Sequence, residues 1–455
     1  MSNMTANREF HGLTEARALL RLGGPLIINN LSIAGMQFAD TVMAGQLGAD
    51  ALAAVAVGGS VWFLAFTFFL GLLMAISPIA ARLHGSGDYG RIGRYTRQGI
   101  YIGIAAGIPL IFVGQLVVEP MLIAIGIAPE FRDMTVGYTG AIMYGAPAIF
   151  VFLALRFTAE GIGHTRPLMY TSVFALVCNV FLNYVLMFGH FGAPALGAVG
   201  CGVASAITMW LIMIAFAVHV LVSRRYRPLK IFSRIAPLRL TVLKEIIFLG
   251  VPIAITITAE AGLFSAVAIL MGTRGSEITA AHQIAINFSA TTFMIPLALS
   301  AATTIRVGQL LGAGNTQDAR VSGITGIVLC ATFMSISALF LLVFRDAVVS
   351  LYTDDVAVKS IAISLLLMAA IFQVADGIQI GSAGALRGYK DTRMPMAINT
   401  FAFWVLAFPL AYLAAITYQA PPNYIWAGFI IGLSVAAILL AWRYNRLSRA
   451  RLTAV

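Results

Sequence analysis

The sequence predicts an all-α integral membrane protein with about twelve transmembrane helices in two six-helix lobes. The chain of 455 residues is 60% hydrophobic and only 10% charged, and its mean hydropathy is +0.91. A water-soluble protein of this length could not cover its surface with so few charges. The apolar residues form runs of about 20 or more, which is the length that crosses a bilayer. The basic residues lie in short segments between these runs, so the net charge of +11 indicates membrane topology and not nucleic-acid binding.

Each half of the chain contains six apolar runs of spanning length. They lie at 22–43, 51–81, 98–118, 135–158, 167–188 and 196–222, and then at 246–272, 278–305, 320–344, 357–386, 396–417 and 423–442. We therefore expect an N-terminal lobe at 1–222, a basic cytoplasmic linker at 223–245 and a C-terminal lobe at 246–455.

The distribution of Lys and Arg predicts the orientation in the membrane. Of the 29 basic residues, all but four fall on one side of the twelve-span arrangement, and the exceptions are Arg132, Arg274, Arg345 and Lys359. Short cytoplasmic segments carry an excess of Lys and Arg. Both termini are therefore predicted to be cytoplasmic.

The two halves repeat with a constant offset, since Pro252 lies 227 residues after Pro25. Glycines and turn residues return at this offset: 22–25 as 249–252, 45–54 as 272–281, 83–87 as 310–314, and 161–166 as 388–393. Such residues serve tight turns and close packing, so the scaffold is what repeats. Because each half has an even number of spans, the lobes should be related by a pseudo-twofold axis along the membrane normal, with a central cavity for a substrate.

Three acidic residues, Asp40, Glu260 and Asp376, are the only ones of the eighteen that lie well inside predicted spans. A charged side chain at membrane depth costs about 2.5 to 3.5 kcal/mol on insertion scales, so it is usually functional. The alternative is a structural carboxylate bonded to a neighbouring hydroxyl or amide. No Lys or Arg is expected inside a span to neutralise these acids.

Other polar side chains accompany the acids at helical spacing. The candidates for supporting contacts are Gln37, Thr256, Asn179, Asn183, Gln283 and Asn287. Their alternative role is hydrogen bonding between helices. Phe372, four residues before Asp376, is a candidate for a cation–π contact with a flat cation, against the alternative of packing toward lipid.

A buried carboxylate can be neutralised by a proton, a metal ion or an organic cation, and these three compete for it. Competition coupled to movement of two lobes is the physical basis of antiport. Sodium needs several oxygens at one place, and no spacing here defines such a site; transient Na⁺ binding at Glu260 and Asp376 stays open. No P-loop, HExxH or GxSxG motif occurs, so we expect no enzyme activity and no cofactor.

Several segments resemble the multidrug and toxic compound extrusion (MATE) transporters, specifically their NorM-like bacterial branch. They are 38–45, 191–204, Ala281-His282-Gln283, Arg306-Val307-Gly308 and 386–392. The resemblance implies two six-helix lobes forming a V in the bacterial inner membrane, and efflux of cationic, lipophilic compounds in exchange for Na⁺ or H⁺. By position, Asp40, Glu260 and Asp376 match the family's membrane acids, and Asn179 and Asn183 match its fifth-span amides. Phe372 replaces a tyrosine of similar sequences, which leaves the coupling ion open.

The main hypothesis is a secondary antiporter in which Glu260 and Asp376 bind both the coupling ion and the substrate, with Asp40 as an acid of the other lobe. The alternative is a flippase for a lipid-linked saccharide precursor, whose anionic pyrophosphate would require an arginine-rich cavity. The expected partners are small organic cations and the lipid bilayer, with no nucleic acid, and the chain is expected to be a monomer.

Overall fold

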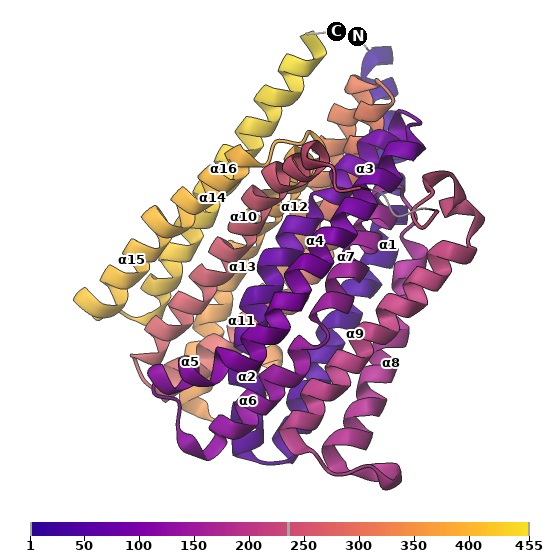
Figure 1. The fold of residues 1–455 in the computed structure, drawn as a ribbon. Helices are drawn as coiled ribbons and strands as arrows, with labels where there is room; N and C mark the ends of the chain where they lie inside the picture. Colours follow the sequence, from indigo (N-terminus) through magenta and orange to yellow (C-terminus); the bar gives the residue numbers. More distant parts are fainter. Residues whose placement is uncertain (1, 234–236, 454–455) are drawn as a thin grey trace. The chain divides into compact units, whose positions relative to one another are not determined.

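The computed structural model describes residues 2–233 and 237–453, and the regular structure in this part of the chain is helical, without β-strands (Figure 1). The longer helices are α1 (Ser2–Gln46), α2 (Ala49–Met74), α3 (Ile76–Gly85), α4 (Tyr89–Leu116), α6 (Pro129–Met143), α7 (Ala146–Gly161), α8 (Arg166–Phe188), α9 (Gly197–Val222), α10 (Leu240–Gly272), α11 (Ser276–Gly312), α12 (Thr316–Ser350), α13 (Val356–Gly388) and α16 (Pro422–Thr453). The shorter ones are α5 (Val118–Ala124), η1 (His190–Gly192), η2 (Arg224–Leu229), α14 (Arg393–Thr400), η3 (Phe401–Ala407), α15 (Phe408–Tyr412) and η4 (Leu413–Thr417). The predicted all-α membrane fold is confirmed.

Each predicted span falls on a helix. Among the described residues, ten helical segments are long and apolar enough to cross a membrane, and α6 with α7, bent by 44° at their junction, makes an eleventh. The remaining predicted span, 22–43, lies in α1. It does not reach the same hydropathy because it contains Asn29, Asn30, Gln37 and Asp40.

The chain forms two compact units. One comprises residues 28–254, and the other comprises the chain up to Ile27 together with the chain from Ile255 onward. The change from one unit to the other falls inside α1 and inside α10, two residues after Pro25 and Pro252. The predicted lobes 1–222 and 246–455 differ from these units because their boundaries were placed between helices.

The leading segments of α1 and α10 pack in the same way within their units. Gly23 on α1 faces α11, where an added Cβ would lie 3.1 Å from the Leu299 side chain. Gly250 on α10 faces α2, where an added Cβ would lie 2.2 Å from the Leu72 carbonyl oxygen. Gly250 lies 227 positions after Gly23, and Leu299 lies 227 positions after Leu72, so equivalent residues meet in both contacts and the sequence repeat corresponds to a repeated packing contact.

A second repeated contact fixes the ends of α7 and α13. A Cβ on Gly161 would lie 2.5 Å from the Ala80 Cβ and 2.7 Å from the Ser77 carbonyl oxygen. The corresponding Gly388 faces the equivalent residues of the second half, Val307 at 2.8 Å and the Thr304 carbonyl oxygen at 3.1 Å. Helices approach this closely only where one of them has no side chain.

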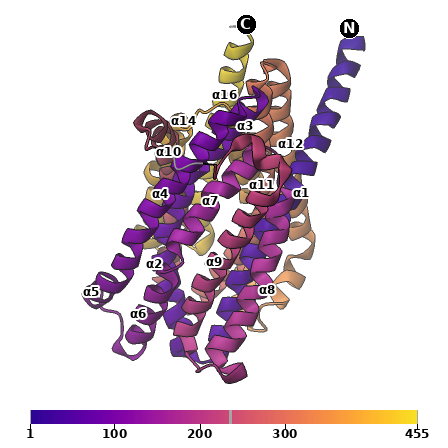
Figure 2. The ribbon, with the colours of Figure 1, turned by 45° about the vertical axis from the view of Figure 1, so that its right-hand side comes forward.

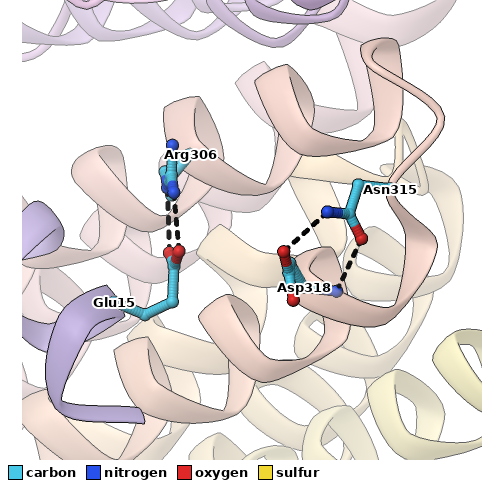
Figure 3. A network of polar contacts seen from close by, with 4 residues as sticks. All are labelled: Glu15, Arg306, Asn315 and Asp318. Atoms are coloured by element: carbon cyan, nitrogen blue, oxygen red, sulfur yellow. Dashed lines mark hydrogen bonds and ion pairs between the residues drawn. The ribbon is translucent and has the colours of Figure 1, made fainter. Parts of the chain in front are cut away.

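The turns repeat as well. Gly48 and Gly275 precede α2 and α11 with φ of +117° and +115°, a conformation that favours glycine. Asp88 caps α4 by accepting a hydrogen bond from the Arg91 backbone N–H at 3.2 Å. Its counterpart Asn315 caps α12 by accepting from the Asp318 N–H at 3.2 Å (Figure 3).

Within the unit 28–254, α8 and α9 run side by side and are joined through η1 at one end (Figures 1 and 2). Within the other unit, α13 packs against α11, α12 and α16, and nearly all of its residues from Phe372 to Gly388 are buried. In this unit α1 begins and α16 ends at the same end of the bundle (Figure 1).

Candidate functional site

Glu260 on α10 and Asp376 on α13 lie in the same unit. Glu260 is half-buried, and Asp376 is only 4% exposed. The two carboxyl groups interact electrostatically. Gly377 allows α13 to approach α12 beside the acid, because an added Cβ there would lie 2.8 Å from the Cys330 carbonyl oxygen. Glu260 and Asp376, two of the three acids predicted from the sequence, are therefore near enough within this unit to act on each other.

Two buried amides lie three residues before and three residues after Asp376. Gln373 donates its Nε2 to Thr292 Oγ1 at 3.1 Å. The Oε1 atoms of Gln373 and Gln379 are buried and accept no hydrogen bond from the described part of the chain. A buried acceptor without a donor is costly, so these oxygens favour a hydrogen-bond donor or a cation near the carboxylate.

Arg387 is a buried cation close to the cluster that was not among the residues predicted for the site. α13 continues to Gly388, so Arg387 lies within the helix and is 7% exposed. Its Nη2 donates to Ser300 Oγ at 2.8 Å, and its charge acts on Glu260. The signal was the repeat, since Arg387 is offset by 227 residues from another buried residue with an ionisable side chain, Glu160.

The other predicted contacts in this unit differ in exposure. Thr256 is half-buried, whereas Gln283 and Asn287 are exposed, and Asn287 Oδ1 accepts from the Tyr352 hydroxyl at 3.1 Å. None of these contacts brings Gln283 or Asn287 to the buried acids.

Phe372 lies in an aromatic cluster and is 2% exposed. Its ring meets those of Phe264, Trp426 and Phe429 edge to face, with centroids 6.0, 6.1 and 6.2 Å away. Trp426 also donates from Nε1 to His282 Nδ1 at 3.2 Å, which fixes the cluster against α11. Core packing therefore accounts for the Phe372 ring in this structure.

Asp40 forms a separate cluster in the other unit. It accepts a hydrogen bond of 2.5 Å from Asn183 Nδ2, and Asn183 in turn donates to Asn179 Oδ1 at 3.4 Å. The Cys201 thiol and Asn179 also interact with the carboxylate. Gln37, one turn before Asp40, is exposed. The predicted amide pair of α8 therefore meets the predicted acid of α1.

The described residues contain no group of three or more His, Cys, Asp and Glu side chains that could hold a metal ion. What they contain is two acidic clusters, one per unit, on helices of spanning length. Buried carboxylates on spanning helices are costly, and they commonly mark the path of a substrate or an ion. The fold and these clusters define a multi-pass membrane transporter.

Comparison with known proteins identifies the family. The MatE family model matches twice, at residues 25–185 and 252–413. The multidrug resistance protein MdtK of Yersinia enterocolitica is 40% identical over 441 residues, which cover 96% of each chain. The chain therefore belongs to the MATE transporter family, as the sequence motifs predict.

Solved structures agree on the fold. The crystal structure of the eukaryotic MATE transporter AtDTX14 superposes with a TM-score of 0.86 at 21% identity, over 97% of this chain and 99% of that one. The outward-facing conformation of a multidrug resistance MATE family transporter gives a TM-score of 0.89 at 19% identity, over 96% and 97% of the two chains.

Proposed function

We propose that this chain is a multidrug efflux transporter of the bacterial inner membrane that works as a secondary antiporter. It exports cationic, lipophilic compounds in exchange for Na⁺ or H⁺, and both termini are cytoplasmic. The name and the 40% identity of the MdtK relative support the efflux of several drugs. The excess of Lys and Arg on one side of the spans supports the orientation.

The observation that carries the antiport mechanism is the electrostatic interaction of Glu260 with Asp376 inside one unit. Two carboxyl groups that interact in a dry environment resist simultaneous ionisation. A proton, a sodium ion or an organic cation relieves the repulsion, and each lowers the affinity for the others. Entry of the coupling ion therefore favours release of the drug.

Arg387 and the buried amides set the charge balance of this cluster. The Arg387 guanidinium attracts the Glu260 carboxylate. Asp376, with amide oxygens on both sides, is the acid that takes up the proton or the ion. In the other unit, the hydrogen bond from Asn183 holds Asp40 as a second acid that can be neutralised during transport.

The test is dye efflux by the purified protein in proteoliposomes, with Na⁺ and pH gradients imposed separately. Glu260→Gln and Asp376→Asn should each reduce gradient-driven ethidium transport by at least about tenfold, because each removes a charge that the cations share. Glu277→Gln, an exposed acid at the start of α11, is the matched control and should transport normally.

Full gradient-coupled export by both cluster variants would refute this assignment. Competition for dye export by a lipid-linked saccharide precursor would instead favour the flippase alternative. In that case Arg387→Gln should weaken the competition, since Arg387 is the buried cation of α13.

A further inference from the structure

The segment that follows α9 is docked firmly on the unit 28–254. Three of its side chains, Tyr226, Leu229 and Ile231, are 2% to 4% exposed. The Tyr226 hydroxyl is hydrogen-bonded to His164 Nδ1 at 3.1 Å. The basic linker, expected from the sequence only as a connection, therefore has a core of its own.

Its backbone is held as well. Arg97 on α4 donates from Nη1 to the carbonyl oxygens of Lys230 and Ile231. Gly93 lies directly under the segment, since an added Cβ would be 1.8 Å from the Leu229 carbonyl oxygen. The docked backbone fixes which side chains of 224–230 point outward.

The outward side chains are cations. Arg224, Arg225, Arg227 and Lys230 are all exposed, and within the described part of the chain none of them forms an ion pair with an acid. Burial, and after it the charge of Arg225, lowers the pKa of His164 to about 4, which agrees with a locally positive environment. Four cations held close together without acids favour an anion.

Apolar side chains flank these cations. Leu221 and Val222 end the spanning helix α9 and are 59% and 72% exposed, and Phe232 on the other side is 45% exposed. A position at the end of a span lies in the headgroup layer of the bilayer. The positive-inside effect accounts for the number of cations, but it acts during insertion and needs no docked backbone.

We propose that the exposed face of residues 224–230 binds the phosphate headgroup of an anionic phospholipid, with the acyl chains against Leu221, Val222 and Phe232. The combination of cations with apolar neighbours at the end of a span fits a lipid better than a soluble phosphate. This site goes beyond the proposed transport activity and does not depend on it.

The test uses the delipidated full-length protein in detergent, with lipid binding followed by native mass spectrometry. Short-chain phosphatidylglycerol should bind at least about tenfold more tightly than phosphatidylcholine, and less tightly as salt rises. The variant Arg224→Gln/Arg225→Gln/Arg227→Gln should lose this preference while it keeps Tyr226 and Leu229. The control Arg446→Gln/Arg449→Gln/Arg451→Gln removes three exposed cations at the end of α16 and should keep it.

Equal binding of the two lipids by the wild-type protein, or an unchanged preference in the first triple variant, would overturn the proposal. So would full competition by inorganic phosphate at matched concentration, which would indicate a site for free phosphate. If the triple variant fails to fold, Arg225→Gln alone provides the test, with an expected loss of about threefold in the preference.

Discussion

The two halves of this transporter share a scaffold and differ in their charges. Gly161 and Gly388 make the same helix contact, with the equivalent residues Ser77 and Thr304 on the other side. The residues directly before these glycines, Glu160 and Arg387, differ between the two halves. Glu160 pairs with Arg156 at 2.8 Å on its own helix, whereas the equivalent residue Arg387 donates to Ser300 and acts on Glu260.

The acidic clusters diverge in the same way. The carboxylate of Asp40 has an amide donor at 2.5 Å, and its neighbours Asn179 and Asn183 bond to each other. Around Asp376, the buried oxygens of Gln373 and Gln379 have no donor within the described residues, and beside Asp40 the Asn183 Oδ1 atom lacks one as well. The clusters therefore differ in the amide that donates directly to Asp40. The residues that set the distances between packed helices are therefore the same in both halves, whereas the polar residues of the two clusters differ.

The largest expected effect tests the shared scaffold. Gly161→Val and Gly388→Val should each destabilise the protein by about 3 kcal/mol, because the new side chain meets backbone and side-chain atoms that cannot move away. Thermal unfolding of the purified variants measures the loss. Gly45→Ala and Gly272→Ala, an equivalent pair with open space around both residues, should unfold near the wild-type temperature. If only one of the two Val variants loses much stability, the contacts of Gly161 and Gly388 are not equivalent.

The next effect tests a charge contact that joins the two halves of the sequence within one unit. Arg306 on α11 donates two hydrogen bonds, of 2.8 and 2.6 Å, to the carboxylate of Glu15 on α1 (Figure 3). Arg306→Met should cost about 2 kcal/mol, since it leaves Glu15 buried without its partner; the guanidinium is 30% exposed, so the loss is below that of a fully buried pair.

The comparison is Arg91→Gln, which removes the exposed ion pair with Asp88 in the other half. Surface pairs contribute little, so its unfolding temperature should change by at most a degree or two. Equal losses of stability for Arg306→Met and Arg91→Gln would show that the burial of Glu15 does not strengthen its ion pair with Arg306.

A smaller effect tests the shared helix caps. Asp88→Ala and Asn315→Ala should each cost about 1 kcal/mol, because each leaves a backbone N–H of the first turn without its acceptor. Asp88→Asn keeps an acceptor oxygen and should be close to neutral. Asn315→Asp also keeps the acceptor, but it replaces the amide that donates to Asp318 Oδ2 at 2.6 Å by a second carboxylate, so it should be destabilising. Unfolding temperatures of the four variants would show whether the cap geometry or the charge is what matters.

The last effect depends on pH and concerns the N-terminal half. His164, outside the spans, has its pKa lowered from 6.5 to about 4 by burial and by the charges of Arg225 and His219. Between these two values the unfolded chain binds a proton that the folded chain does not, so stability should fall as the pH falls from 6.5 toward 4.

Hydrogen exchange of residues 224–230 should therefore be faster at pH 5 than at pH 7, after correction for the intrinsic rate, because Tyr226 bonds to His164. His164→Gln should remove most of this difference. His190→Gln, which replaces an exposed histidine, should keep it. If the wild-type protein and both variants show the same difference in exchange between pH 5 and pH 7, protonation of His164 does not control the docking of residues 224–230.

The sequence predicted much of this architecture because spans, glycines and isolated acids leave local signals. The offset of 227 residues marked Gly161 and Gly388 as equivalent scaffold positions, although it did not identify the residues that they contact. The acids Asp40, Glu260 and Asp376 were identifiable because an ionised group is costly at membrane depth.

Partners across helices could not be predicted in this way. Helical spacing placed Asn179 and Asn183 on one face of α8, but it does not indicate which other helix that face contacts. The hydrogen bond from Asn183 to Asp40 joins residues 143 positions apart. Arg387 was assigned to a turn because the apolar run ends at Leu386, whereas packing against Ser300 extends the helix past it. Glu15 was overlooked because it precedes the first apolar run.

The division of the chain inside α1 and α10 has a consequence for biosynthesis. The unit 28–254 includes the first part of α10, up to Ala254. A ribosome that has just completed α9 has therefore not yet made the part of α10 that packs against Gly71 and Leu72. The other unit includes the chain up to Ile27. These residues are synthesised first, and their packing partner α11 is made much later. Neither half of the sequence therefore contains all the residues of one compact unit, and each unit is completed by a helix segment from the other half.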